Sequence, residues 1–194
     1  MPAPSPLKFI RGFAARPRQV GAVMPSGRAL AGAMVGGLTL RATGSVVEFG
    51  PGTGPFTRAI LNAQPAGACY LGVELDTEFV AHLRERFPRE DFAHASAADA
   101  FDLHAERGLP PVDAVLCGLP FASLPAGVQD GVVDAIDRLL EHGGTFRTFQ
   151  YLHAFNMVNA KKFRARMDGL FGPGKCVAKV LRNMPPACVM SWSR

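Results

Sequence analysis

The sequence predicts an α/β fold in which helices cover both faces of a mostly parallel, seven-stranded sheet. From Val46 onward, short apolar segments alternate with amphipathic ones, which is the pattern of strands joined by crossover helices. The last two apolar segments follow each other with no helix between them, so they are expected to form an antiparallel hairpin at one edge of the sheet.

Each expected strand is a short apolar segment bounded by turn residues. The strands are expected at residues 46–49, 69–74, 92–95, 112–117, 145–151, 175–182 and 187–192. One helix starts at Asp76 or Thr77 and ends before Pro88, and another is stopped by Gly143 and Gly144. Further helices are expected from Ser26, on Phe56, Ile60 and Leu61, on Val128, Val132, Ile136 and Leu140, and over residues 153–168.

The first 16 residues are expected to form a separate short helix that Pro17 ends. Its apolar and basic residues fall on opposite sides, as in an interfacial helix on an anionic membrane. The membrane-binding residues are expected to be Leu7, Lys8, Phe9, Ile10, Arg11, Phe13, Arg16 and Arg18. The alternative is that the apolar side packs against the protein's own core.

Composition limits the class of protein. A chain of 194 residues with 48% hydrophobic and 19% charged residues favours one folded domain. The net charge of +5 favours an anionic partner, either nucleic acid or an acidic membrane leaflet, although solubility alone explains it equally well. No apolar segment approaches the roughly 18 residues of a membrane-spanning helix, and no secretory leader is evident, so a cytoplasmic location is expected.

The four cysteines lack metal-site spacing and are expected to be free thiols, and no metal site is expected.

The segment VVEFGPGTG, residues 46–54, is a strand that enters a glycine-rich turn. A strand, a glycine turn and a helix together bring backbone amides close to a nucleotide-like ligand. The spacing differs from the dinucleotide pattern, since Gly54 comes one residue early, and no Lys-Ser/Thr pair follows as in a phosphate-binding P-loop. A purely structural turn remains the alternative.

Two carboxylates extend the pattern. Glu74 ends the second strand, where it can accept hydrogen bonds from ribose hydroxyls, and Asp99 follows the third strand, where it can accept one from an adenine amine. The plain alternatives are a helix cap for Glu74 and a solvated loop residue for Asp99. In order and spacing, the loop and both acids resemble the class I methyltransferases that use S-adenosyl-L-methionine. The resemblance implies a cofactor site at Ser26, Glu48, Gly50, Pro51, Gly52, Thr53, Gly54, Glu74, Leu75, Ala98, Asp99 and Ala100, with Glu48 facing the methionine end.

The sequence of the loop after the fourth strand indicates which kind of methyl acceptor is expected. In adenine-N6 methyltransferases this loop resembles Asn-Leu-Pro-Tyr, whereas here it is Gly118-Leu119-Pro120-Phe121. The amide that would grip a flipped base is missing, which removes a hydrogen bond worth about 1–3 kcal/mol.

A closer resemblance covers nearly the whole chain. Residues 20–34 (VGAVMPSGRALAGAM), 118–125 (GLPFASLP) and 182–189 (RNMPPACV) are similar to the bacterial phospholipid N-methyltransferases. That resemblance implies stepwise methylation of phosphatidylethanolamine toward phosphatidylcholine on the inner face of the plasma membrane. It implies a phospholipid substrate and an anionic membrane surface as partners, with no nucleic acid and no obligate protein partner. Residues 1–25 would form a membrane-binding and substrate-covering segment, and residues 26–194 the methyltransferase domain.

The acceptor pocket is expected at Gly118, Leu119, Pro120, Phe121 and Tyr151. The family commonly has Gly-Pro after the fifth strand, whereas this chain has Leu152-His153-Ala154. Tyr151 and His153 are the candidate bases for removing the ammonium proton, and each has a plain structural alternative. Two other functions stay open: an RNA adenine-N6 or small-molecule methyltransferase, and a binding module without catalysis.

Overall fold

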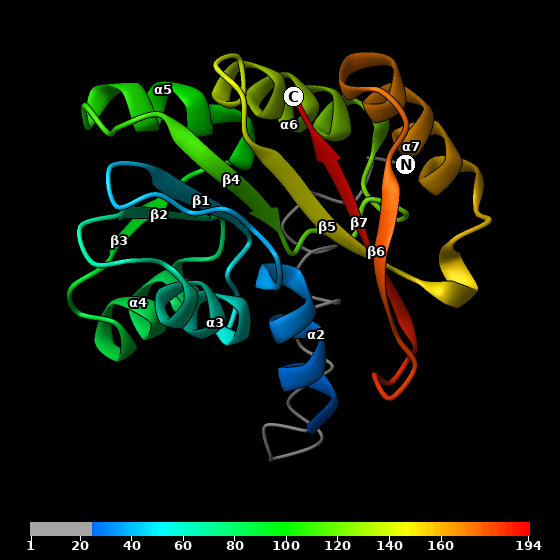
Figure 1. Cartoon of the computed structure of the whole chain (residues 1–194), viewed down its shortest axis with the longest axis horizontal. Coiled ribbons are helices and arrows are strands. Elements are labelled where there is room, and N and C mark those ends of the chain that lie inside the picture. The colour runs from blue at the N-terminus through cyan, green and yellow to red at the C-terminus, as the bar shows by residue number, and fades with distance from the viewer. Residues whose placement is uncertain (1–24) are drawn as a thin grey trace, which may run out of the picture.

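The computed structural model describes residues 25–194, and these form a seven-stranded sheet between two layers of helices (Figure 1). The strand order is β3-β2-β1-β4-β5-β7-β6. All expected strands are present, the first five run parallel, and β7 pairs antiparallel with both β5 and β6. The strands are β1 Ser45–Phe49, β2 Cys69–Glu74, β3 Asp91–His94, β4 Val112–Cys117, β5 Thr145–Tyr151, β6 Lys175–Val180 and β7 Ala187–Ser193.

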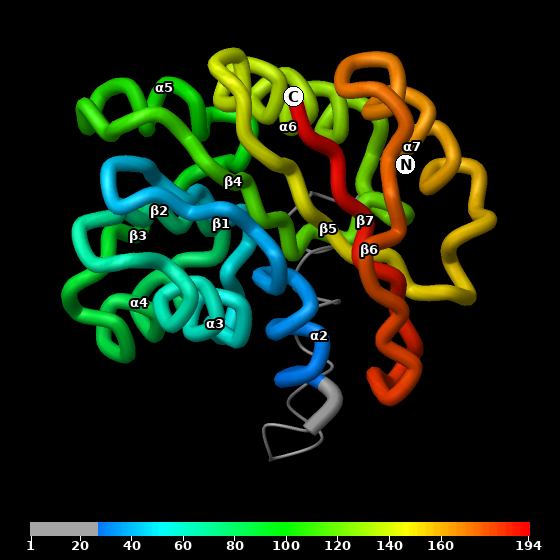
Figure 2. The backbone as a smooth tube through the Cα atoms, in the orientation of Figure 1, coloured from blue at the N-terminus to red at the C-terminus, as the bar shows by residue number. Residues whose placement is uncertain are grey.

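The helices divide between the two faces of the sheet. One apolar core lies under α2 (Pro25–Val35), α3 (Pro55–Ala63) and α4 (Thr77–Arg86). The other lies under α5 (Ala100–Glu106), α6 (Ala126–Leu139) and α7 (Val158–Phe171). Figure 2 shows that α2 lies beside the β6–β7 hairpin, so the first described helix packs near the last two strands.

Local sequence signals explain several boundaries. Asp76 caps α4, since its carboxylate accepts hydrogen bonds from the backbone N–H groups of Glu78 and Phe79. Pro55 occupies the first turn of α3, where its missing N–H costs nothing.

The helix expected over residues 153–168 is wrong at its start. Leu152–Ala154 form a 3₁₀ turn, η3, and α7 begins only at Val158. The backbone N–H of Leu152 donates to the carbonyl of Pro186 at 2.9 Å, which holds this part of the chain against the hairpin before a helix can begin. Helix α5 was not expected, because its sequence AFDLHAE is short and half polar.

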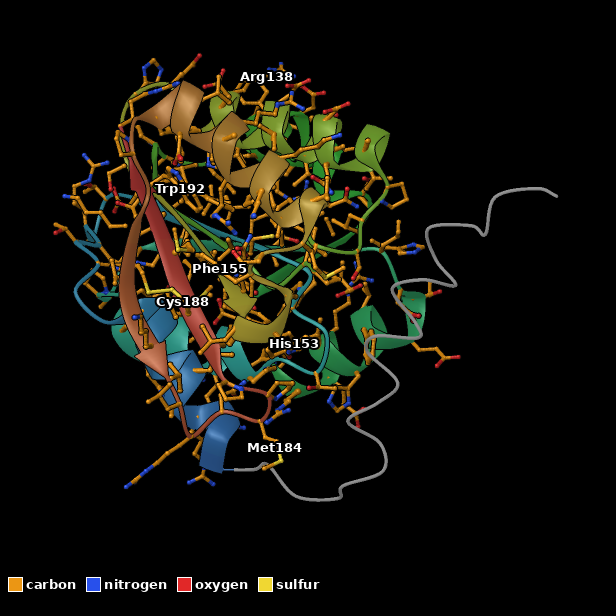
Figure 3. All side chains as sticks on the ribbon, turned by 90° about the vertical axis from the view of Figure 1, so that its right-hand side faces the viewer. Arg138, His153, Phe155, Met184, Cys188 and Trp192 are labelled. Atoms are coloured by element: carbon orange, nitrogen blue, oxygen red, sulfur yellow. A yellow bond between two sulfur atoms is a disulfide. The ribbon has the colours of Figure 1, made fainter. Side chains whose placement is uncertain are left out.

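Two of the four cysteines differ from the expectation that all are free thiols. Cys69 and Cys117 are free thiols, but Cys176 and Cys188 of the neighbouring strands β6 and β7 form a disulfide, visible beside the Cys188 label in Figure 3. The sequence carried no spacing signal for this pair, because strand pairing brings the two residues together. Within residues 25–194, no helix is both long and apolar enough to cross a bilayer.

Candidate active site

The glycine loop leaves the carboxyl end of β1 and enters α3. Gly50, Gly52 and Gly54 have φ angles of +67°, +58° and +79°, which only glycine adopts without strain. The N–H of Gly50 donates to the carbonyl of Val73 at 2.9 Å, which fixes the start of the loop against β2. The tight turn expected from the sequence is therefore present.

Glu74 at the end of β2 is joined to this loop. Its Oε2 accepts a hydrogen bond from the Gly52 N–H at 3.0 Å, and its Oε1 accepts from the N–H groups of Leu75 and Asp76 at 2.9 and 3.0 Å. The side chain is 3% exposed, and burial raises the pKa of Glu74 although the three N–H groups oppose the rise. The carboxylate is thus fixed at the loop, and Oε2 retains capacity to accept another hydrogen bond.

A cavity of about 320 Å³ opens beside Glu74 and the glycine loop. Its wall is mainly apolar, and Glu74 and Ser96 are the lining residues with polar side chains. The lining residues are Gly50, Val73, Glu74, Leu75, Ala95, Ser96, Ala97, Leu119, Leu124, Val128 and Val132. The size and lining suit a small ligand with a planar apolar part and a few hydroxyl groups, such as a nucleoside.

The other residues that were expected to bind the cofactor do not line this cavity. Asp99 is exposed at the end of the 3₁₀ turn η2 (Ala97–Asp99), and only the earlier part of that turn lines the cavity. Pro51 and Ala100 are buried, Ala98 is half-buried and Thr53 is exposed. The side chain of Ser26 lies outside the described residues. Contacts from these residues to a cofactor stay predictions.

Glu48 lies within β1 and has a different environment from the one expected. Its Oε2 accepts hydrogen bonds from Thr57 Oγ1 at 2.7 Å and from the Tyr70 hydroxyl at 2.5 Å. The side chain is fully buried and does not line the cavity, and its Oε1 has no hydrogen-bond partner among the described residues. Burial raises the pKa of Glu48 to about 7 against the lowering effect of both hydroxyls. Glu48 therefore ties α3 to β2, and its contact with the methionine end stays a prediction.

The loop after β4 packs directly on the glycine loop. A Cβ atom at Gly118 would lie 2.9 Å from the carbonyl oxygen of Gly50, so only glycine allows this approach. Gln129 of α6 anchors the far side of the loop, since its Nε2 donates to the carbonyls of Phe121 and Leu124 at 2.8 and 2.9 Å. Leu119 lines the cavity and contacts Gly50, while Pro120 is half-buried.

Phe121 occupies a core position. It is 2% exposed and stacks on Phe163 of α7, with ring centroids 3.8 Å apart. The ring that was expected to stack on the methyl acceptor is thus covered by a helix in this structure, so stacking on a substrate would need the ring to move.

Comparison with known proteins decides the family. The family model described as "Methyltransferase domain" matches residues 47–146, which are 100 of the 194 residues and run from β1 to the start of β5. The chain belongs to this methyltransferase family. Membership of this family implies that S-adenosyl-L-methionine is the cofactor. All residues that line the cavity lie inside the matched segment.

Two curated relatives are similar to the methyltransferase. The ornithine lipid N-methyltransferase of Singulisphaera acidiphila is 29% identical over 145 residues, which are 73% of this chain and 71% of that protein. The ribosomal RNA small subunit methyltransferase A of Prochlorococcus marinus is 30% identical over 106 residues, which are 55% of this chain but 34% of that protein.

Solved structures confirm the fold. An O-methyltransferase from Bacillus cereus aligns over 100% of this chain and 93% of its own, with a TM-score of 0.64 and 11% identity. The 1,6-didemethyltoxoflavin-N1-methyltransferase of Burkholderia thailandensis aligns over 100% and 92%, with a TM-score of 0.64 and 16% identity. The Rossmann-like methyltransferase architecture expected from the sequence is therefore present.

The two candidate bases of the methyltransferase lie at the end of β5. The rings of Tyr151 and His153 stack with centroids 5.7 Å apart, and Phe149 meets the Tyr151 ring edge-on. His153 is exposed, whereas burial raises the pKa of Tyr151. A phenol with a raised pKa keeps its proton at neutral pH, so Tyr151 suits the role of an aromatic wall or hydrogen-bond donor better than that of a base.

Sequence reasoning missed two residues that shape the candidate site, Gln129, which anchors the loop after β4, and Ser96, which lines the cavity. Gln129 gave no signal, because a glutamine in a helix is normally a surface residue. Ser96 of the cavity wall was passed over between the third strand and Asp99. The expected membrane-binding residues, from Leu7 to Arg18, lie outside the described residues.

Proposed function

We propose that this methyltransferase transfers a methyl group from S-adenosyl-L-methionine to the amine of a bacterial membrane lipid. Phosphatidylethanolamine and its methylated derivatives, which lead to phosphatidylcholine, are the acceptors that we expect. The observation that carries the proposal is the similarity to an ornithine lipid N-methyltransferase over 73% of the chain. The acceptor loop supports it, since Gly118 stands where a base-gripping amide would be needed.

The described residues have clear tasks toward the cofactor, which supplies a methyl group on a sulfonium. Glu74 would accept a ribose hydroxyl on Oε2, while the apolar wall of Val128 and Val132 would cover the adenine ring. Asp99 would bind the adenine amine from the open side. Because the glycine loop carries no cationic side chain, it suits a ligand without phosphate.

The acceptor amine must be neutral to attack a methyl group. Positioning and exclusion of water would then supply most of the acceleration. His153 is the better of the two candidate bases, because its ring is exposed, whereas Tyr151 is partly buried and burial raises its pKa. Tyr151, stacked on it, would hold the methylated ammonium against its ring.

We propose that residues 1–25 attach the enzyme to the anionic inner face of the plasma membrane and cover the lipid headgroup. Each basic residue near such a surface contributes about 1 kcal/mol. The enzyme would then be cytoplasmic and peripheral, with neither nucleic acid nor an obligate protein as partner. Loss of vesicle binding on deletion of residues 1–16 would support this assignment.

A second candidate is methylation of adenine in RNA. The similarity to a ribosomal RNA methyltransferase favours it, although that similarity covers only 34% of the relative. The missing amide at Gly118 speaks against a flipped base.

One experiment separates these functions. Purified protein and labelled S-adenosyl-L-methionine are incubated with vesicles of phosphatidylethanolamine, with vesicles of an ornithine lipid, and with ribosomal RNA. We expect label in the lipid fractions, most strongly in phosphatidylethanolamine. Label in RNA alone would replace the proposal by the second candidate, and an absence of cofactor binding by calorimetry would leave a binding module without catalysis.

A further inference from the structure

Several exposed apolar side chains belong to the segment that follows β5 and to the turn that joins β6 to β7. Among residues 25–194, seven large apolar side chains are exposed, and five of them belong to η3, the start of α7 and the β6–β7 turn. Three of these belong to η3 and the β6–β7 turn, which are joined by the hydrogen bond from Leu152 to Pro186, and we call these three the apolar tip: Leu152 (37% exposed), Leu181 (67%) and Met184 (80%). Exposed apolar side chains that gather in this way mark a binding surface more often than they occur by chance.

The topology puts the apolar tip on the same edge of the sheet as the cofactor cavity. Residues 181–186 connect β6 to β7, and Leu152 directly follows β5. Since β5 runs parallel to β1 and β4, its end faces the same way as the two loops that form the cavity. Figure 3 shows Met184 and His153 near one end of the molecule and Arg138 at the other.

Hydrogen bonds hold the tip in an ordered shape. The buried side chain of Asn183 donates from Nδ2 to the carbonyl of Pro185 at 2.6 Å, and its N–H donates to the carbonyl of Val180 at 3.2 Å. The N–H of Leu152 donates to Pro186 and joins η3 to the turn. Asn183 points inward and fixes the turn, so that Leu181 and Met184 on either side of it point to solvent.

The stretch of sequence that contains the apolar tip is rich in cations. Residues 151–187 contain seven lysines and arginines (Lys161, Lys162, Arg164, Arg166, Lys175, Lys179 and Arg182) but only one carboxylate, that of Asp168. Asp168 is engaged by the Trp192 indole N–H at 2.7 Å and by the Gly174 N–H. Within the part of the chain that the structure describes, Lys161, Lys162, Lys179 and Arg182 are exposed and form no ion pair.

We propose that the apolar tip is a membrane-docking surface that inserts into the interface of an anionic bilayer. Its apolar side chains would enter the boundary between headgroups and acyl chains, while Lys179 and Arg182, which lie within two residues of Leu181, would contact lipid phosphates. Lysine is depleted at protein–protein interfaces, so the exposed Lys179 beside the tip favours a lipid surface over a protein partner. The proposal rests on the proposed function for its lipid substrate, since docking by this edge would turn the active site toward the bilayer.

The test compares two matched double variants of the full chain. Leu181→Ser/Met184→Ser alters the tip, and Leu170→Ser/Val177→Ser removes two other exposed apolar side chains, at the far end of α7 and within β6. Binding is measured by flotation with phosphatidylcholine vesicles that contain phosphatidylglycerol. We expect the tip variant to bind at least about tenfold more weakly, because two apolar side chains are withdrawn from the lipid interface. The control variant should bind within about twofold of wild type.

Further measurements keep the outcome interpretable. Both variants should bind S-adenosylhomocysteine like wild type, which shows that they fold, and wild-type binding should fall with added salt and without phosphatidylglycerol. Equal vesicle binding by the two variants would overturn the proposal. So would a wild-type dimer in light scattering that the tip variant alone dissociates, because the tip would then bind a second copy.

Methyl transfer to a short-chain, water-soluble phosphatidylethanolamine separates this proposal from the proposed function. The tip variant should methylate that lipid at the wild-type rate and vesicle lipid more slowly. If wild type methylates the soluble lipid but vesicle binding does not depend on the tip, docking by the tip is wrong and the function stands. If wild type methylates no lipid while binding still depends on the tip, the function is wrong and the docking surface stands.

Discussion

At the scale of single residues, the two glutamates near the glycine loop differ in what the sequence could say about them. Glu74 was predictable, because a carboxylate at the end of the second strand lies beside the loop in any parallel sheet of this order. The partners of Glu48 were not, because Tyr70 and Thr57 reach it only through the pairing of β1 with β2 and the packing of α3. The position of Glu74 follows from the strand order, whereas the environment of Glu48 depends on side-chain packing.

The buried carboxyl of Glu48 predicts a pH-dependent stability. Its pKa is raised from 4.5 to about 7, so between these values the folded protein binds more protons than the unfolded chain. The free energy of unfolding should therefore fall as pH rises from about 4.5 to 7, by about 2–4 kcal/mol from this group alone.

The variant Glu48→Gln removes this titration and keeps an oxygen that can accept from both hydroxyls. Urea unfolding at pH 5 and at pH 7.5 should show a gain in stability, relative to wild type, that is present only at the higher pH. The exposed Glu141→Gln serves as the control and should follow wild type at both values. A gain of the same size at both pH values would contradict the role assigned to burial.

At the scale of elements, apolar runs predicted all seven strands. Five strands are largely buried, whereas β3 is half exposed and β6 is mostly exposed at the edge of the sheet. Helices depended on periodicity and on end signals such as Asp76 and Pro88, and their bounds were predicted less well. The helix expected at residue 153 starts at Val158 instead, since a hydrogen bond to a residue 34 positions later holds Leu152 in a turn. No local sequence pattern indicates a hydrogen bond between residues so far apart in the chain.

Helix α2 depends on a cation from the sheet. The guanidinium of Arg147 in β5 is 6% exposed and donates to the carbonyls of Met34 and Gly36 at 3.1 and 2.7 Å, at the carboxyl end of the helix. Arg147→Met would leave these carbonyls unpaired and should cost about 2–3 kcal/mol of stability.

Chemical denaturation would measure this cost, with Arg138→Met as the matched control. Arg138 is half exposed and pairs with Asp102 on the surface, so its loss should cost less than about 1 kcal/mol. Similar costs for both variants would show that Arg147 does not hold the end of α2.

The loop between β4 and α6 depends on Gln129 in a similar way. Gln129→Leu removes both donors to the carbonyls of Phe121 and Leu124 and should cost about 1–3 kcal/mol. Amide hydrogen exchange should rise in residues 118–125 and stay unchanged in β1 and β4. An equal rise throughout the sheet would mean that the variant is unfolded globally rather than released at the loop.

At the scale of the whole molecule, the cofactor cavity is lined by residues at or just after the ends of β1, β2, β3 and β4, together with residues of α6. A ligand that fills it should therefore stabilise the entire sheet. At a concentration about 100-fold above its dissociation constant, S-adenosylhomocysteine should add about 2.7 kcal/mol. For a chain of this size, that gain corresponds to a rise in Tm of about 5–11 °C.

Glu74→Ala decides whether this stabilisation passes through the predicted pocket. Loss of the carboxylate should weaken ligand affinity about tenfold, so at the same ligand concentration the gain should fall to about half of the wild-type value. Glu85→Ala, an exposed change on α4, should keep the full gain and controls for removal of a charge. Calorimetric scans with and without ligand measure both. If Glu74→Ala keeps the full rise in Tm, the ligand binds away from the carboxyl end of β2, and the position assigned to the cofactor is wrong although the fold is right.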